Sequence, residues 1–164
     1  MPVNLELKIK VDFVKKIERL LHTKKVLFVG ILKQKDIYYE YKNGLLKMRL
    51  EDGSACLIKY LRDEKGKRWS NYKIVNINGS EPEKYFADIL KVESIVEKER
   101  KLYKYKNTRI HVDTVKSLGY FLELETLVTS GKKQAEKEFA EVVELLQLDL
   151  SKQIKSSYRN LINR

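Results

Sequence analysis

The sequence predicts a mostly β protein of the α+β kind, an antiparallel barrel or tunnel of about eight strands with helices packed outside. Apolar and polar residues alternate with a period of two in many short segments, as they do in half-buried strands. Tight-turn sequences such as Asn43-Gly44 and Glu51-Asp52-Gly53 separate neighbouring segments, which is typical of antiparallel hairpins. Because closure removes exposed strand edges, many strands with few helices favour a barrel.

The first half of the chain is predicted to form five strands and one helix. Leu5, Leu7 and Ile9 alternate with charged residues, so a strand is expected over residues 4–11. Asp12 is a plausible N-cap for a helix that continues to Leu21. An apolar segment over residues 26–31 then leads into a meander of strands at 34–41, 45–50, 55–62 and 69–77.

The second half is predicted to contain a hairpin, a last strand and three helices. Pro82 suits the first turn of a helix. A hairpin across Lys106-Asn107 joins strands 94–105 and 108–115, and the last strand covers 120–127. A longer helix follows Gly131, and a short helix begins at about Ser151. The expected buried faces are Tyr85, Phe86, Ile89 and Leu90 on the first of these helices and Phe139, Val142, Val143 and Leu146 on the second. No segment has the composition of a linker, so we expect one domain over residues 1–164.

The charge balance predicts an anionic ligand. The chain has 34 Lys and Arg against 23 Asp and Glu, a formal charge of +11, which attracts nucleotides, polyphosphate, nucleic acid or acidic membranes. Cys56 is the single cysteine, so no intrachain disulfide can form, and we expect it to be a small buried apolar residue. The first residues lack the apolar core of a signal peptide, and no run is long enough to span a membrane. We therefore expect a cytoplasmic protein.

Several predicted strands carry charged residues on one face. Lys47 and Arg49 are two apart, and so are Lys98 and Arg100. Each pair alone is typical of a solvated face. Together they predict one surface lined by cations and a few carboxylates, which suits a polyanion with a divalent metal. Inside a barrel such charges are costly unless they are paired or hold a ligand.

The order of these segments resembles the CYTH superfamily, the triphosphate tunnel enzymes. Asn4-Leu5-Glu6-Leu7-Lys8 is similar to the family's ExExK signature. The segment closest to the family's acidic strand is Leu118-Gly119-Tyr120-Phe121-Leu122-Glu123-Leu124-Glu125. Further similar segments lie in family order at 34–39, 46–49, 62–63, 66–72, 98–100, 109–113 and 157–161. The class IV adenylyl cyclase-like proteins are the most similar branch.

The resemblance implies a tunnel in which basic side chains hold a triphosphate and carboxylates hold Mg²⁺ or Mn²⁺. These ions suit oxygen ligands, and arginine pairs with phosphate through two parallel hydrogen bonds. The implied metal ligands are Glu6, Glu123 and Glu125, with Asp113 ligating the ion or supporting its ligands. The implied phosphate-binding residues are Lys8, Lys47, Arg49, Arg62, Arg68, Lys98, Arg100 and Arg109, with Lys8 and Arg100 as the catalytic pair.

The chain also departs from the family pattern. Asn4 stands where the fuller signature has a glutamate, so we expect weaker metal binding. The family's R-x-E-x-E strand resembles residues 68–72, with both carboxylates replaced, and a lysine of the fourth strand falls near Tyr60. Arg62 is expected to supply that charge, and Lys59 to be solvated. His111 is expected to be a barrel residue with satisfied hydrogen bonds, with a proton relay as the alternative. Tyr72 is more typical of a barrel end than of a purine-stacking platform.

Three functions remain open at this point. Two are enzymatic: ATP cyclisation to cyclic AMP and pyrophosphate, and hydrolysis of thiamine triphosphate, tripolyphosphate or a nucleotide. The third is non-catalytic binding of polyphosphate or RNA. A nucleic-acid binder is expected to gather its basic residues on an outer groove with stacking aromatics. Here the basic residues share strand faces with carboxylates, which argues against nucleic acid and for a nucleoside or other triphosphate. The oligomeric state is not predicted.

Overall fold

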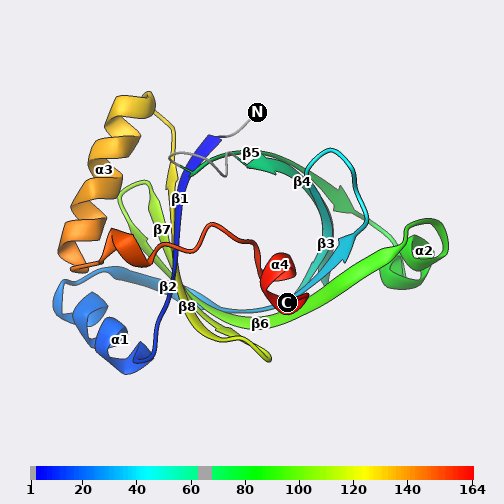
Figure 1. Cartoon of the computed structure of the whole chain (residues 1–164), viewed down its shortest axis with the longest axis horizontal. Coiled ribbons are helices and arrows are strands. Elements are labelled where there is room, and N and C mark those ends of the chain that lie inside the picture. Colours follow the sequence, from blue (N-terminus) through cyan, green and yellow to red (C-terminus); the bar gives the residue numbers. More distant parts are fainter. Residues whose placement is uncertain (1–2, 63–67) are drawn as a thin grey trace.

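Eight antiparallel strands close into a barrel in the order β1-β5-β4-β3-β2-β6-β7-β8 (Figure 1). The computed structural model describes residues 3–62 and 68–164, with the side chains at positions 61, 62 and 68 outside the description. The predicted eight-stranded antiparallel barrel is confirmed. The strands are β1 (Val3–Lys10), β2 (Leu27–Tyr39), β3 (Leu45–Glu51), β4 (Ser54–Arg62), β5 (Arg68–Ile77), β6 (Val92–Tyr105), β7 (Thr108–Val115) and β8 (Gly119–Leu127).

The helices pack on the outside of the barrel wall. Figure 1 shows α1 and α3 on the side of β1, β7 and β8, and α2 on the opposite side. The helices are α1 (Val14–Thr23), α2 (Pro82–Ile89), α3 (Lys132–Leu145), the 3₁₀ turn η1 (Leu150–Lys152) and α4 (Tyr158–Ile162). Within the described ranges, no helix has the length and apolar character needed to cross a bilayer.

The largest apolar core lies between the outer face of the barrel and helices α1 and α3. Leu7, Leu122 and Leu124 point outward from β1 and β8 into this core, where they meet Leu21 of α1 and Val142 of α3. The predicted stripe of α3 is confirmed at Val142 and Leu146, which are buried, and at Phe139 and Val143, which are partly buried. Since the apolar residues of β1, β7 and β8 are covered from outside, the alternate residues of these strands must face the barrel interior, here called the lumen.

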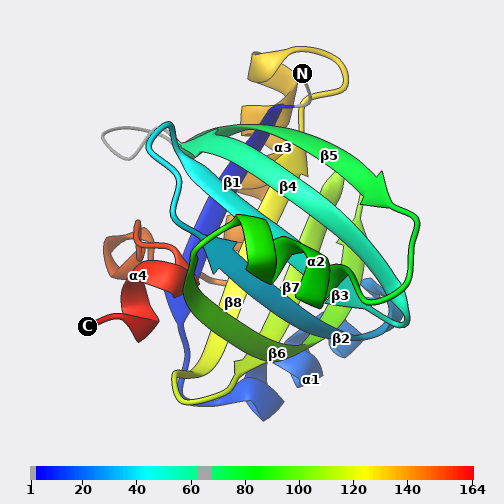
Figure 2. The same cartoon turned by 90° about the vertical axis from the view of Figure 1, so that its right-hand side faces the viewer.

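Two local predictions are wrong. Asp12 is not an N-cap: α1 begins at Val14 after Phe13, and no side chain caps it. Only part of the face predicted for α2 is buried, because this helix has a neighbour on one side only (Figure 2). Phe86 packs against the outer faces of β2 and β3, whereas Tyr85 and Ile89 are exposed. In addition, the apolar segment at 26–31 belongs to the long strand β2, which runs unbroken from Leu27.

The register of the strands aligns the charged residues across the wall. On β1 and β8, Glu6 lies opposite Glu125 and Lys8 opposite Glu123. On β6 and β7, Arg100 lies opposite Asp113. Charges that are far apart in the sequence therefore meet on neighbouring strands inside the lumen.

Candidate functional site

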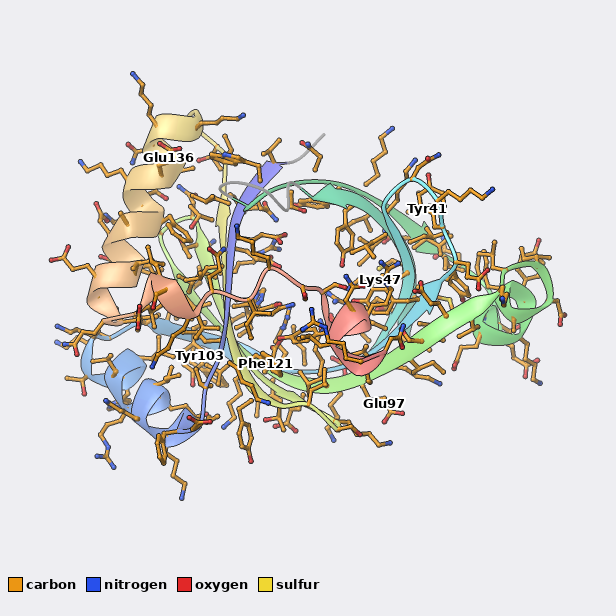
Figure 3. All side chains as sticks on the ribbon, in the orientation of Figure 1. Tyr41, Lys47, Glu97, Tyr103, Phe121 and Glu136 are labelled. Carbon is orange, nitrogen blue, oxygen red and sulfur yellow. The ribbon has the colours of Figure 1, made fainter. Side chains whose placement is uncertain are left out.

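The lumen holds a cavity of about 310 Å³ that is lined by residues from all eight strands. Figure 3 shows Lys47 pointing into the ring of strands, while Glu97 points away from it. The lining residues are spaced two apart on each strand, which is the parity that the alternation predicts. The charged residues that line the cavity are Lys8, Lys47, Arg49, Lys98, Arg100 and Arg109 with Glu6, Glu51, Glu123 and Glu125.

The structure thus brings together nearly all the residues predicted for the site. Asp113 does not line the cavity but lies directly behind Arg100, fully buried. The side chains of Arg62 and Arg68 lie outside the described residues, so their predicted roles stay predictions. Lys59 is exposed, as expected, and Tyr60 lines the cavity in its place.

Asp36, which was not predicted, binds three of the phosphate-binding candidates. Its fully buried carboxylate accepts hydrogen bonds from Lys47 Nζ at 2.7 Å, from Lys98 Nζ at 3.0 Å and from Arg49 Nε and a terminal nitrogen at 2.7 and 2.8 Å. Burial would raise the pKa of Asp36, but these cations hold it well below its usual value. Asp36 therefore stays anionic and fixes the positions of three cations at the cavity wall.

Arg100 is held by two carboxylates. Its guanidinium donates to both oxygens of Asp113, at 2.7 and 2.6 Å, and to Glu123 at 2.6 Å. Tyr158 of α4 donates its hydroxyl proton to the same Asp113, at 2.9 Å. Both Asp113 oxygens are occupied in this way, so the supporting role fits this residue better than metal ligation. Burial opposes the charge of Asp113, but Arg100 lowers its pKa.

Lys8 joins the acidic wall to the C-terminal segment. Its ammonium lies 3.1 Å from Glu123, donates to the backbone oxygen of Ser156 at 3.2 Å, and sits 3.7 Å from the centre of the Tyr158 ring. This ammonium is almost fully buried and still faces the cavity. A buried, compact cation with an anionic partner is suited to bind a phosphate oxygen.

A candidate metal site lies between β7 and β8. One ligand atom each of His111, Glu123 and Glu125 lies within 4.8 Å of the others. His111 Nδ1 is buried, has no hydrogen-bond partner among the described residues, and lies 3.9 Å from an oxygen of each glutamate. Ligands on opposite sides of one divalent cation are about 4–4.5 Å apart, so this set fits such an ion. Glu6, the third predicted ligand, lines the cavity opposite Glu125 but is not one of these three.

The neighbouring charges keep Glu123 and Glu125 in the ionised form that binds a cation. Burial would raise the pKa of Glu123, but Lys8, His111 and Arg100 hold it well below its usual value. Burial likewise opposes the charge of Glu125, but His111 and Arg109 lower its pKa to about 2. Arg109 lies 2.7 Å from Glu125. Both carboxylates are therefore ionised near neutral pH.

Asn4 and Cys56 also face the cavity. Asn4 is buried, and its side-chain oxygen has no hydrogen-bond partner among the described residues. It therefore offers a polar atom to the lumen but no charge. Cys56 is partly buried, and burial raises the pKa of its thiol, so it fits a packing role better than that of a nucleophile.

Comparison with known proteins now places the chain. Residues 3–158 match the family described as CYTH domain. The chain belongs to the CYTH family. A curated relative from Methanocaldococcus jannaschii, named "Putative adenylate cyclase", is 28% identical over 177 residues, covering 97% of this chain and 98% of that protein. This CYTH protein is thus similar to its relative over almost the full length of both chains.

Solved structures share the fold of this chain. The PH1012 protein of Pyrococcus horikoshii superposes with a TM-score of 0.84 at 25% identity, over 96% of this chain and 98% of that one. A Hippeastrum protein described as a "Putative adenylyl cyclase" with a dominant triphosphatase activity superposes with a TM-score of 0.67 over 99% and 95% of the two chains. At 10% identity, the Hippeastrum structure shows a shared fold alone.

Proposed function

We propose that this CYTH protein binds a triphosphate in its lumen and cleaves it with the help of a divalent cation. One observation carries the proposal: six basic side chains line the same 310 Å³ cavity as the group formed by His111, Glu123 and Glu125. A triphosphate needs cations along its phosphate tail and a metal site beside it. A merely structural charge network has no need for a cavity at its centre.

His111, Glu123 and Glu125 would hold the cation, with Glu6 near enough to contribute. A divalent ion bound there would neutralise charge that develops on phosphoryl oxygens. Carboxylates suit Mg²⁺ and Mn²⁺ alike, whereas an imidazole ligand favours Mn²⁺ over Mg²⁺. We therefore expect Mn²⁺ to bind more tightly.

The other residues bind and orient the phosphates. In this structure Lys47, Arg49 and Lys98 are held by Asp36, and Arg100 is held by Asp113. The four cations line the cavity and the two carboxylates do not, so phosphate oxygens could approach these cations from the cavity. Because the cations are already positioned, little reorganisation is needed when the ligand binds.

Adenylyl cyclisation is the first candidate reaction, supported by the name of the Methanocaldococcus jannaschii relative. The ribose 3′-oxygen of ATP would form a bond to the α-phosphorus while the bond from that phosphorus to the bridging oxygen breaks. Pyrophosphate leaves, and the 3′-hydroxyl proton passes to solvent or to a nearby base. Arg100 and Lys8, which line the cavity, would stabilise charge on the leaving group.

Hydrolysis of the terminal phosphate is the second candidate. Water would form a bond to the terminal phosphorus while the bond from that phosphorus to the bridging oxygen breaks, and the proton of water would pass to solvent. His111, Glu123 and Glu125 lie beside Arg100 and Lys8, so water attack at a terminal phosphorus needs no group beyond these. The products would be orthophosphate and the corresponding diphosphate. The described activity of the Hippeastrum protein is of this kind.

A product assay tests the proposal. Wild type is incubated with ATP, thiamine triphosphate and tripolyphosphate under Mn²⁺ and Mg²⁺, and the products are separated by chromatography. Cyclic AMP with pyrophosphate supports the cyclase, and orthophosphate without a cyclic product supports the hydrolase. Turnover should be lost in Glu123→Gln and kept in Glu97→Gln, where the same change is made outside the barrel (Figure 3). Absence of turnover with tight triphosphate binding would leave a non-catalytic binder.

Metal binding has its own test. His111→Gln should weaken Mn²⁺ binding by about tenfold, since one ligand of the set is removed. His22→Gln is the matched control, because His22 is exposed on α1. Calorimetric titration with Mn²⁺ measures both, and equal affinities in the two variants would remove His111 from the site.

A further inference from the structure

Tyr158 is the first residue of α4, and its buried side chain lines the cavity. The ring of Tyr158 packs edge-on against Phe121 of β8, with the two ring centres 5.0 Å apart. The preceding residue, Ser157, accepts a hydrogen bond from the backbone N–H of Asn160 and so caps the helix. Tyr158 is therefore fixed both by the packing of its ring and by the start of its helix.

The segment that precedes α4 is attached to β1. The backbone N–H of Ile154 donates to the backbone oxygen of Lys8 at 2.8 Å, and Gln153 forms an isolated bridge with Ile9. Tyr158 thus reaches the cavity from the C-terminal segment, which is itself bound to the strand that carries Lys8.

The hydroxyl group of Tyr158 is connected to Arg100 through Asp113. It donates to Asp113 Oδ2 at 2.9 Å, and Arg100 donates to the same oxygen at 2.6 Å. Burial and the charges of Glu123 and Asp113 hold the pKa of Tyr158 well above its usual value, so the hydroxyl stays protonated and can donate. Asp113 does not line the cavity. We therefore expect this hydroxyl to act on Arg100 rather than on a ligand.

The ring of Tyr158 lies beside two lysines. Lys8 Nζ is 3.7 Å from the ring centre, and Lys98 Nζ is 5.2 Å from it. An ammonium group is attracted to the face of an aromatic ring, and the attraction is stronger where water is excluded. Because a lysine has a flexible four-carbon stem, a fixed ring next to its ammonium restricts the positions that the charge can take.

We propose that Tyr158 is a positioning residue, whose ring holds Lys8 and Lys98 and whose hydroxyl holds Arg100 through Asp113. The inference rests on the proposed function, because these three cations are among those assigned to the phosphates of the ligand. Cations that are already in place need little reorganisation when a triphosphate binds.

Two substitutions separate the hydroxyl from the ring. Tyr158→Phe removes only the hydrogen bond to Asp113 and should weaken tripolyphosphate binding by about fivefold. Tyr158→Leu also removes the ring next to Lys8 and should weaken binding by about fiftyfold. Calorimetry measures both affinities. Tyr120→Phe and Tyr120→Leu are the matched controls, because Tyr120 is exposed on β8, and both should bind as wild type does.

A double-mutant cycle separates positioning from a general effect on the fold. Arg100→Ala should still bind tripolyphosphate, since the other basic residues that line the cavity remain. If the hydroxyl acts through Arg100, adding Tyr158→Phe to Arg100→Ala should change the affinity by less than about twofold. A merely structural role would instead give the same fivefold loss in both backgrounds.

Three results would overturn the inference while leaving triphosphate binding intact. They are a Tyr158→Phe variant that binds as wild type does, a Tyr158→Leu variant that binds no more weakly than Tyr158→Phe, and additive losses in the cycle. The Phe variant keeps the ring that packs on Phe121, so the cycle can be measured even if Tyr158→Leu does not fold. Failure of wild type to bind tripolyphosphate would overturn the proposed function itself, and the inference with it.

Discussion

The two sides of the lumen are stabilised in different ways. The charged residues depend on one another: Asp36 holds three cations, and Asp113 with Glu123 holds Arg100. The cavity-facing residues Ile58, Tyr60, Tyr72 and Ile74, here called the β4–β5 wall, are uncharged. On the charged side, a substitution leaves a buried charge without its partner and should lower the free energy of unfolding strongly. On the apolar side, a substitution should lower it less. Function can vary more easily where a substitution leaves no buried charge unpaired.

The largest loss of stability is expected from a substitution of Asp36 on the charged side. Asp36→Asn leaves three buried or partly buried cations without their shared carboxylate. We expect a loss of about 3–5 kcal/mol in the free energy of unfolding, as for other broken buried ion pairs. Urea unfolding followed by circular dichroism measures this loss. Glu97→Gln, on the outer face, should stay within about 0.5 kcal/mol of wild type. A loss below about 1 kcal/mol in Asp36→Asn would show that the charged side is not interdependent.

Removal of a phosphate-binding residue should have a smaller effect, on binding more than on folding. Arg49→Ala should weaken tripolyphosphate binding by about 1.5–3 kcal/mol, because it removes a charge-assisted contact in a partly desolvated site. Arg19→Ala, on the exposed face of α1, is the control. Calorimetry should find the control equal to wild type, and an unchanged affinity in Arg49→Ala would eliminate this residue from the phosphate site.

A rise in pH should weaken phosphate binding to the charged side of the lumen without any mutation. Burial lowers the pKa of Lys47 and of Lys98 to about 8 against the favourable effect of Asp36. Both lysines are therefore cationic at pH 7 and mostly neutral at pH 9. Since phosphate binds the cationic form, tripolyphosphate affinity should fall by up to about tenfold per lysine between these values. Binding at pH 8 should also take up protons, seen as a dependence of the measured heat on the buffer. An affinity that stays flat to pH 9 would contradict the low pKa values.

The smallest effect is expected on the apolar side. Ile58→Val removes one methylene group from a buried residue of the β4–β5 wall and should lower the free energy of unfolding by about 0.5–1.5 kcal/mol. No charge loses a partner. Urea unfolding beside Asp36→Asn measures the contrast directly, and a loss that approaches that of Asp36→Asn would show that both sides are equally intolerant.

The inward-facing residues could be predicted from the sequence because strand parity depends on local pattern alone. The alternation around Lys47 and Arg49 is visible in six residues, because the intervening residues Leu46, Met48 and Leu50 are apolar. The same reasoning failed for α2, since the periodicity of Tyr85 and Phe86 does not say that only one side of the helix has a neighbour. It failed for Asp12 because α1 begins at Val14, after Phe13, and no side chain caps its first turn.

The three-dimensional structure was needed to recognise the roles of Asp36, His111 and Tyr158. Asp36 has the inward parity of Gln34 and Tyr38, but its role in holding cations depends on contacts such as that with Lys98, which is 62 residues away. His111 shares the parity of Arg109 and Asp113, yet only the register of β7 and β8 brings it to Glu123 and Glu125. Tyr158 comes from a segment whose path over the barrel follows from tertiary packing, so no strand pattern predicts it.

The closed ring of hydrogen-bonded strands also determines the path by which a ligand enters the lumen and its products leave. A ligand has no sideways exit, so it must enter and leave along the barrel axis. The C-terminal segment that carries Ser156 and Tyr158 crosses the ring in Figure 1 and contacts Lys8. Under the proposed function, a triphosphate that enters with its phosphate tail first would be cleaved with one product seated deeper than the other. The product seated nearer the opening should then leave first, and the product seated deeper should act as a competitive inhibitor of the next turnover.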